Sequence, residues 1–298
     1  MQVKDLGEFA LIERFRNKIK TDPSVIVGSG DDCAVLEFDK QHYQLFTCDI
    51  LVEGVDFTPK DNPRLVGRKA IAVSLSDIAA CSGIPRYCVI SLGLPKNTEL
   101  KYVDMLFNGA LAIAKKYMLN IVGGDLSHSS KVIIDVSMIG VVEKKSLTLR
   151  SSALPGDIIF VTGPLGGSIL GKHLNFRPRV KEARFLAKNY KVNAMIDISD
   201  GLSQDLGHIL SRSRVGGVIY KDLVPLSKEA RNLSDALNNG EDFELLFTLS
   251  RPQAKQLLRN RNLKAWPIGE ILDKKYGYKL IDEKGKAVNI KPEGFRHF

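Results

Sequence analysis

Acidic side chains recur beside glycines and at the ends of apolar segments along the chain. The sites are Gly30-Asp31-Asp32, Cys48-Asp49, Gly123-Gly124-Asp125, Asp197-Ile198-Ser199-Asp200-Gly201 and Gly240-Glu241-Asp242. Adjacent Asp and Gly residues usually form turns, and Ser199 or Asp200 could simply cap a following helix. The sites are more numerous than turns require, however, and ligands gather at the carboxyl ends of strands. The pattern therefore favours a ligand site built from carboxylates.

Asp77 occupies a predicted helix, on a face that otherwise carries Ala, Ile, Val and Leu. A charged acid on such a face is costly unless it is paired or bound to a metal. Mg²⁺ prefers oxygen ligands and is typically held by one or two carboxylates together with substrate phosphates. Several Asp residues from separate elements therefore predict several Mg²⁺ ions facing a triphosphate. That arrangement is typical of phosphoryl transfer, in which positioning and charge neutralisation do most of the work.

Alternating strands and helices are predicted to position these acids. Asn62-Pro63 is typical of a helix start, and this helix is expected to run to about Ser82. Further helices are expected at 98–118, 166–174 and about 202–212. Apolar runs predict strands at 43–48, 87–94, 120–122, 132–142, 157–162, 194–198 and 243–249. The mixture indicates an α/β or α+β fold.

A charged and Ser-rich stretch at 143–155, ending in Pro155-Gly156, interrupts this pattern. It predicts two domains, residues 1–148 and 149–298, and a chain of 298 residues is long enough for both. The first 20 residues alternate charged with apolar side chains. This alternation predicts an amphipathic helix and not a signal peptide with an apolar centre.

The net charge of +9, from 43 Lys+Arg and 34 Asp+Glu, is compatible with several kinds of partner. Nucleic acid, a membrane surface, an anionic small substrate and an ordinary lysine-rich surface all fit a basic balance. The basic residues are thinly spread, and aromatic residues do not interleave with them as stacking platforms would. No apolar run approaches the roughly 18 residues of a membrane span. We expect a cytoplasmic protein without nucleic-acid or membrane partners.

The four cysteines, Cys33, Cys48, Cys81 and Cys88, form no CxxC pair and lie among apolar neighbours. A zinc site would need more closely spaced ligands. We therefore expect free, buried thiols in a reducing compartment.

Residues 166–173, GGSILGKH, nearly match the phosphate-binding pattern GxxxxGK[ST] and follow a predicted strand. The last position is His173, so the hydroxyl group that holds Mg²⁺ in a P-loop is missing. We therefore do not expect this segment to be a P-loop.

Six motifs occur in an order that resembles one kinase family. They are GDDCAVL (30–36), CDILVEGVDF (48–57), SLSDIAACSGIP (74–85), GGD (123–125), DISDGL (197–202) and GEDFELLF (240–247). With the opening LGEFALI and the terminal GFRHF, they are similar to thiamine-monophosphate kinase. This family belongs to the superfamily of aminoimidazole ribonucleotide synthetase and selenophosphate synthetase. The resemblance covers essentially the whole chain.

The resemblance implies ATP-dependent phosphorylation of thiamine monophosphate to thiamine diphosphate by direct in-line transfer. It also implies a homodimer in which the mixed N-terminal sheets pair into a barrel, with ATP in clefts at the interface. The C-terminal α/β domain would close each site. No general base is obvious. The acceptor phosphate is already an anion at neutral pH, so proton removal is not the main problem.

The resemblance also implies roles for individual residues. The implied Mg²⁺ ligands are Asp32, Cys48, Asp49, Asp77, Asp125, Asp197 and Asp200. Cys48 stands where relatives carry Ser or Thr. The implied catalytic residues are Asp77, Asp125 and Asp200. The implied ATP contacts are Gly124, Asp125, Arg150, Ser199 and Tyr102. On the thiamine side the implied contacts are Asp56, Glu241 and Phe295.

The chain departs from the family pattern at several positions. Asp56 stands where the family usually has a substrate-contacting His, and an acid there would repel a phosphate but favour the cationic thiazolium. Gly167 stands where Asp is common, and Asn239 where Gly is common. The segment 171–179 is also shorter than usual. These departures concern the thiamine monophosphate site more than the ATP and Mg²⁺ site.

Two alternatives remain open. The chain could be another ATP-using enzyme of the superfamily that acts on a different small substrate. Selenophosphate synthetase in particular would need a reactive Cys or selenocysteine in a Gly-rich N-terminal segment, and no such segment precedes Cys33. The second alternative is a non-catalytic binding protein that kept the fold. That alternative predicts loss of the metal-binding acids, yet all six Asp residues are present.

Overall fold

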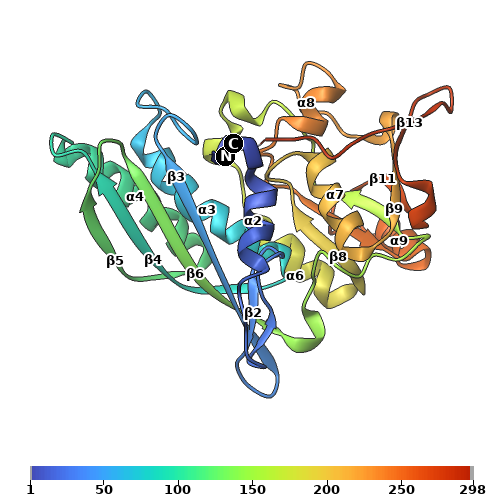
Figure 1. Ribbon diagram of the computed structural model, residues 1–298, viewed down its shortest axis with the longest axis horizontal. Coiled ribbons are helices and arrows are strands. Elements are labelled where there is room, and N and C mark those ends of the chain that lie inside the picture. Colours follow the sequence, from blue (N-terminus) through green and yellow to red (C-terminus); the bar gives the residue numbers. More distant parts are fainter. Residues whose placement is uncertain (1, 296–298) are drawn as a thin grey trace.

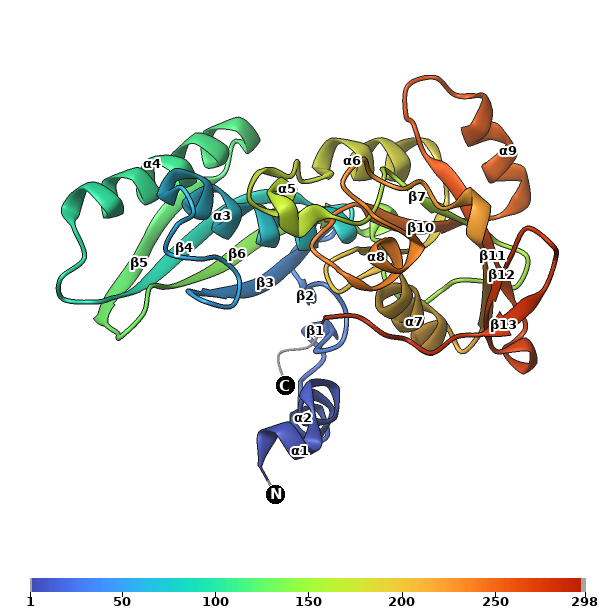
Figure 2. The same ribbon diagram turned by 90° about the horizontal axis from the view of Figure 1, so that it is seen from above.

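The computed structural model describes residues 2–295, which form two sheets with helices packed around them (Figure 1). The end of the GFRHF motif, residues 296–298, lies outside the described residues. The N-terminal sheet has six strands in the order β1-β2-β3-β6-β4-β5. Their bounds are β1 Val25–Val27, β2 Ala34–Glu37, β3 His42–Val52, β4 Ile84–Leu94, β5 Asn120–His128 and β6 Ile133–Glu143. Two helices, α3 Pro63–Ala80 and α4 Leu100–Tyr117, cover one face of this sheet (Figure 2).

The C-terminal sheet has seven strands in the order β13-β12-β9-β11-β7-β10-β8. Their bounds are β7 Ile158–Val161, β8 Val192–Asp197, β9 Gly216–Tyr220, β10 Leu245–Leu249, β11 Trp266–Leu272, β12 Tyr278–Ile281 and β13 Ala287–Asn289. The helices of this half are α5 Lys172–Asn175, α6 Val180–Asn189, α7 Leu202–Ser213, α8 Leu233–Asn238 and α9 Arg251–Arg259. Short 3-10 turns lie at Lys144–Ser146, Ser168–Leu170, Lys221–Leu223 and Lys274–Tyr276. The predicted mixed α/β fold with two sheets is confirmed.

Helix α3 lies at the centre of the molecule. Its start is fixed as the sequence predicts, because the Asn62 side chain accepts a hydrogen bond from the Arg64 N–H and Pro63 occupies the first turn. Most of its 18 residues are buried, since it packs against β3 and β6 on one side and against α5, α6 and β8 on the other. Side chains on this helix therefore reach both halves of the chain.

Two strands of the N-terminal sheet are longer than the sequence predicts. β3 pairs with β6 along its whole length, from His42 opposite Glu143 to Val52 opposite Ile133. β5 likewise follows β4 in parallel as far as His128. Asp49 and Asp125 therefore lie inside strands, so the prediction that they follow strand ends was wrong. The error arose because polar residues end an apolar run in the sequence but do not end the backbone ladder.

Glycines break two of the predicted helices. The expected helix over residues 1–20 is two helices, α1 Val3–Leu6 and α2 Glu8–Arg16, separated at Gly7 with φ 78°. The expected helix at 166–174 is a 3-10 turn followed by the four-residue α5, separated at Gly171 with φ 130°. Such φ values suit glycine and cannot continue an α-helix. In Figure 2 the α1–α2 arm projects from the body formed by the two sheets.

Candidate functional site

Three buried or half-buried carboxylates meet where the two halves of the chain touch. Asp32 lies in the loop before β2, Asp77 in the last turn of α3, and Asp197 at the end of β8. One ligand oxygen from each lies within 4.8 Å of the others. The sequence predicted that these acids converge, and the structure brings them together. We refer to Asp32, Asp77 and Asp197 as the acid cluster.

Hydroxyl groups of α3 and β3 fix the carboxylates. Ser76 Oγ donates to Asp197 Oδ2 at 2.6 Å, and Thr47 Oγ1 donates to Asp77 Oδ2 at 2.5 Å. A third donor, Ser74 Oγ, lies 2.6 Å from Asp49 Oδ2. Sequence reasoning missed these hydroxyls. The signal was present in the SLSD motif, where Ser74 and Ser76 precede Asp77.

Crowding and burial make these acids resist ionisation. Burial, followed by the charge of Asp32, raises the pKa of Asp197 to about 8. Burial raises the pKa of Asp49 to about 6 despite the Ser74 hydrogen bond. The pKa of Asp77 is raised well above its usual range by burial and then by Asp49 and Asp197. The acids would ionise together only if positive charge were brought among them.

Arg150 is the cation that contacts the acid cluster. Its guanidinium group donates two hydrogen bonds to Asp32, of 2.9 and 3.2 Å, in the bidentate geometry that suits a carboxylate. Burial would lower the pKa of Arg150, but Asp32 and Asp31 outweigh it and raise the pKa. One guanidinium group does not balance three carboxylates and Asp49. The donor set therefore fits hard divalent cations such as Mg²⁺, which take oxygen ligands.

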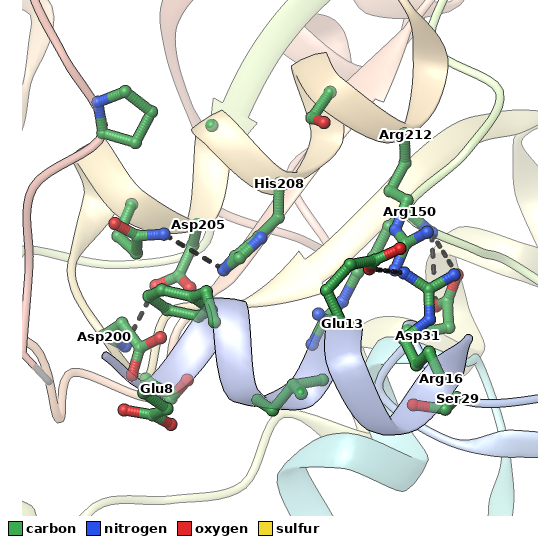
Figure 3. A pocket seen from close by; sticks show the side chains of 18 residues that line it. Glu8, Glu13, Arg16, Ser29, Asp31, Arg150, Asp200, Asp205, His208 and Arg212 are labelled. Atoms are coloured by element: carbon green, nitrogen blue, oxygen red, sulfur yellow. Dashed lines mark hydrogen bonds and ion pairs between the residues drawn. The ribbon is translucent and has the colours of Figure 1, made fainter. Parts of the chain in front are cut away.

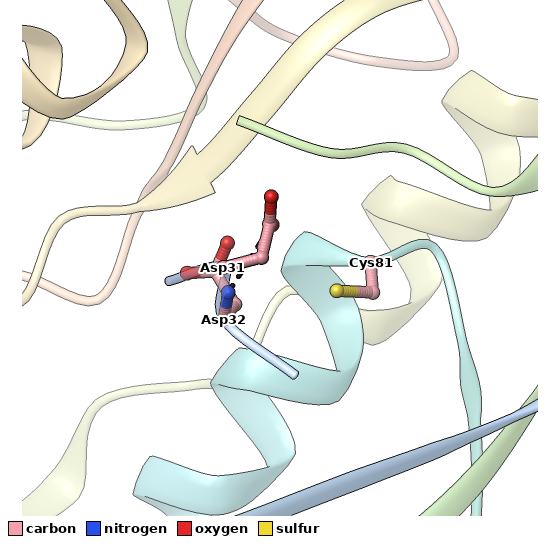
Figure 4. A group of neighbouring side chains, drawn as sticks. All are labelled: Asp31, Asp32 and Cys81. Atoms are coloured by element: carbon pink, nitrogen blue, oxygen red, sulfur yellow. Dashed lines mark hydrogen bonds between the residues drawn. The ribbon is translucent and has the colours of Figure 1, made fainter. Parts of the chain in front are cut away.

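Cys81 also lies beside the acids but has the wrong chemistry for Mg²⁺. Asp31, Asp32 and Cys81 each offer an atom within 4.8 Å of the others (Figure 4). A hydrogen bond with Cys33 would lower the pKa of the Cys81 thiol, but burial and the charges of Asp32 and Asp31 raise it. A protonated thiol is not a ligand for a hard cation. All four cysteines are free as expected, although Cys48 is exposed, so the expectation that every thiol is buried was wrong for Cys48.

A cavity of about 820 Å³ opens beside Arg150. Its lining includes two predicted nucleotide contacts, Arg150 and Ser199, together with Asp200. Asp200 also groups with two residues of α7, Asp205 and His208, with one ligand atom from each within 4.8 Å. Figure 3 shows the three side chains on one side of the cavity. Asp200 thus belongs to a second group of possible ligands, next to the acid cluster.

Glu241 lies in a buried charge network that connects the two halves. Its backbone has φ 57°, a left-handed conformation that few non-glycine residues adopt and that often marks a functional position. The fully buried Lys69 on α3 places Nζ 2.5 Å from Glu241 Oε1, and His173 Nδ1 lies 2.9 Å from Glu241 Oε2. Although burial favours the neutral acid, His173 and Lys69 lower the pKa of Glu241. Lys69 and His173 were not predicted from sequence.

The other two predicted substrate contacts lie near this network and near the cavity. Asp56 Oδ2 accepts a hydrogen bond of 2.7 Å from the Val52 N–H, and the Asp56 carbonyl oxygen accepts one of 2.8 Å from Lys69 Nζ. Phe295 donates its N–H to the Asp200 carbonyl oxygen at 3.0 Å. The structure therefore places Asp56 beside Glu241 through Lys69, and Phe295 beside Asp200.

Cys48 and Asp125 lie on the opposite face of the N-terminal sheet from the acid cluster. Side chains alternate along β3, so Thr47 and Asp49 point toward α3 while Cys48 points away and is exposed. Ile50, two residues after Cys48, lies on the same outer face. Asp125 shares this face, because paired residues connect it to Ile50 across the sheet, through Ser91 and Asp135. Within one chain these residues do not join the acid cluster, and their metal-binding role stays a prediction.

Gly124 and Tyr102 have structural partners in the N-terminal half. A Cβ built on Gly124 would clash with the Ile90 carbonyl oxygen, so close strand packing already requires glycine there. Tyr102 begins α4, packs against the core, and has its pKa raised by burial and by Glu53. Neither lines the cavity, and their nucleotide contacts stay predictions.

The near-match to a P-loop has another structure and other partners, as expected. Lys172 Nζ lies 3.3 Å from Glu244 Oε1 and 3.8 Å from Asp242 Oδ1, so its charge is already paired. The segment leads into a four-residue helix, whereas a P-loop leads into a long helix whose N-terminus binds phosphate.

Comparison with known proteins identifies close relatives along the whole chain. Residues 30–142 match the family model "AIR synthase related protein, N-terminal domain", and residues 154–281 match its C-terminal counterpart. A thiamine-monophosphate kinase of Buchnera aphidicola subsp. Schizaphis graminum is 35% identical over 99% of both chains. One from Aquifex aeolicus is 33% identical over 100% of both.

Solved structures show the same relationship. The structure of AaThiL complexed with AMPPCP and TMP has a TM-score of 0.87 at 33% identity, covering 100% of this chain and 99% of that one. The Escherichia coli hydrogenase maturation protein HypE, at 20% identity and a TM-score of 0.75, shares the fold alone.

Proposed function

Because the chain belongs to the thiamine-monophosphate kinase family, we propose that it transfers the γ-phosphoryl group of ATP to thiamine monophosphate, giving ADP and thiamine diphosphate. The observation that carries the proposal is the acid cluster at the contact between the two halves, with Arg150 bound to Asp32. The relative AaThiL was solved with AMPPCP, a β,γ-methylene analogue of ATP, and TMP. That complex supports a ternary site of the same kind in this chain.

The proposed mechanism assigns roles to residues of this chain. Asp32, Asp49, Asp77 and Asp197 would hold Mg²⁺, with Asp200 at the cavity and Cys48 and Asp125 on the outer face of the sheet. Bound Mg²⁺ would neutralise the charge of the triphosphate and of the transferring group. Arg150 and Ser199 would orient phosphate groups at the cavity wall. Ser76 and Thr47 would keep the carboxylates in place for their ligand role.

The thiamine side would be built around Glu241. Its carboxylate is held by Lys69 and His173 at a strained backbone position, which is a preorganised arrangement for contacting a substrate. Asp56 and Phe295 would complete this side. An acidic side chain at position 56 suits the cationic thiazolium ring of thiamine better than its phosphate.

The proposal also includes two domains in each chain, residues 1–148 and 149–298. Two copies of the chain would form a homodimer through the N-terminal domain. The outer face of the N-terminal sheet exposes Phe46, Ile50, Val89 and Val122. A sheet face with this many apolar side chains favours association, and a second copy covering it would bury them. Cys48 and Asp125 lie on the same face, so the partner sheet would lie next to them.

The direct test is to mix the protein with ATP, Mg²⁺ and thiamine monophosphate and to measure thiamine diphosphate. We expect product that depends on all three components. An exposed acid on α4 gives a matched control, because Asp104→Asn should retain turnover whereas Asp77→Asn should lose most of it. ATP binding without any thiamine diphosphate would refute the proposed acceptor and favour another ATP-using activity of the superfamily.

A further inference from the structure

Three guanidinium groups converge on one wall of the cavity. Arg16 comes from α2, Arg150 from the segment before β7, and Arg212 from α7. A Cβ built on Gly30 would clash with the Arg212 guanidinium group and would lie 3.1 Å from Arg16 Cζ, so both arginines reach the same glycine. Figure 3 shows Arg16, Arg150 and Arg212 gathered at the same end of the cavity.

The three arginines differ in how their charge is compensated. Arg150 is bound to Asp32, and Arg16 Nη1 lies 2.6 Å from Glu13 Oε2. Arg212 has no hydrogen bond or ion pair to any residue in the described range 2–295. Burial and the like charges of Arg16 and Arg150 lower the pKa of Arg212, and the opposite charges of Asp31 and Glu13 offset this only in part. An anion placed between Arg16 and Arg212 would relieve this repulsion and use the free donors of Arg212.

Glu13 and Asp31 lie among the three arginines, whereas none of the described lining residues at the other end of the cavity is an arginine (Figure 3). Glu8 and Asp200 line that other end, and their carboxylates would repel a phosphate group. Asp205 also lines it, but burial raises the pKa of Asp205 well above its usual range. Gln204, which also lines the cavity, is about 5% exposed and leaves Oε1 without a hydrogen-bond partner among the described residues. This end offers an acceptor and negative charge, so an anionic ligand would be oriented with its phosphate toward the arginines.

We propose that Arg16 and Arg212 form a phosphate-binding subsite beside Arg150, with Arg16 carried over the cavity by the α2 helix. A guanidinium group donates in a planar fork that matches phosphate oxygens, and two such groups can hold one phosphate from two sides. The phosphate belongs either to the triphosphate of the nucleotide or to the monoester of the acceptor. Only this choice of ligand rests on the proposed function. The anion chemistry rests on the residues themselves.

A binding experiment tests the subsite without turnover. Inorganic diphosphate is titrated calorimetrically into the full-length protein in a chelating buffer, so that no metal links the anion to the acids. Arg212→Ala should weaken diphosphate binding about tenfold or more, since hydrogen bonds between charged groups are stronger than those between neutral groups. Arg16→Ala should also weaken it, and Arg212→Lys should lie between wild type and Arg212→Ala because the charge is kept but the fork is lost.

Two exposed arginines outside the cavity lining serve as matched controls. Arg14→Ala is the control on α2, and Arg214→Ala is the control just beyond α7. Both should bind diphosphate as wild type does. Equal affinity of Arg212→Ala and Arg214→Ala would overturn the proposal.

Thermal unfolding without ligand separates a binding role from a structural one. Burial and the like charges of Arg16 and Arg150 outweigh the attraction of Asp31 and Glu13, and Arg212 has no hydrogen-bond partner among the described residues. Arg212→Ala should therefore leave the unfolding midpoint unchanged or raise it. A clear fall in the midpoint, to the extent seen when a buried ion pair is broken, would show a structural role and overturn the proposal.

Steady-state kinetics identify the source of the phosphate. A rise in KM for ATP in Arg212→Ala, with KM for thiamine monophosphate unchanged, would assign the subsite to the nucleotide. The converse would assign it to the acceptor, and no change in either would overturn the proposal. If the wild-type protein makes no thiamine diphosphate, the proposed function fails, while the diphosphate titration still decides the subsite.

Discussion

Asp197→Asn tests whether the acid cluster is held together against charge repulsion. Asp197 is about 3% exposed, and its pKa is raised from 3.8 to about 8, first by burial and then by Asp32. Folding therefore takes up a proton at this residue over the intervening pH range. The contribution of this proton to the free energy of unfolding is fully present below about pH 4 and is lost as the pH rises toward 8.

The size of the effect follows from the proton uptake. One proton taken up on folding makes stability fall by about 1.4 kcal/mol for each pH unit. Asparagine keeps the shape of the side chain and can still accept the hydrogen bond from Ser76, but it has no proton to take up. In the metal-free protein, the variant should gain stability relative to wild type by up to about 3 kcal/mol between pH 5 and pH 7.

Urea unfolding of the metal-free proteins at pH 5, 6 and 7 measures this difference. Asp104→Asn, an exposed acid on α4, should show no such trend. Adding Mg²⁺ should remove the advantage of Asp197→Asn, because the ion then supplies the charge that the proton supplied. A stability difference that is the same at all three pH values would refute the electrostatic account of the cluster.

Three further substitutions probe the supporting residues. Thr47→Val removes the donor to Asp77 and should raise the Mg²⁺ concentration needed for half-maximal turnover; an unchanged Mg²⁺ dependence would contradict the role we give Thr47. Lys69→Met leaves Glu241 without its buried cation and should lower the free energy of unfolding by about 3 kcal/mol, as measured by urea unfolding at pH 7. Asp56→His should change KM for thiamine monophosphate but not KM for ATP, and the reverse result would place position 56 on the nucleotide side.

The sequence predicted the parts of the site that depend on local signals. The cap at Asn62 and the apolar faces of α3 located the helix that carries Asp77, and Asp197 was recognised at the end of an apolar strand. Their convergence with Asp32 could be expected because acids on separate elements are tolerated in a core only where they share a cation. The family resemblance gave the same residues independently.

Other features needed the folded chain. Whether Thr47 or Cys48 points toward the acids depends on the phase of alternation in β3, and that phase is set by pairing with β6 over eleven residues. The partners of Lys69 lie more than 100 residues away, at His173 and Glu241. No local sequence pattern distinguishes Arg212 from an ordinary surface arginine. Arg16 comes to lie beside it only because α2 packs there in the folded chain.

The contact between Ser76 and Asp197 has a consequence for how tightly the two halves of the chain are held together. Ser76 lies in the half that carries α3, whereas Asp197 lies in the half that carries β8, so neither half contains a complete ligand set. A cation bound by acids from both halves would act as a removable crosslink between them. Separately expressed fragments 1–148 and 149–298 should therefore associate more tightly when Mg²⁺ is present. A chelator should weaken their association again.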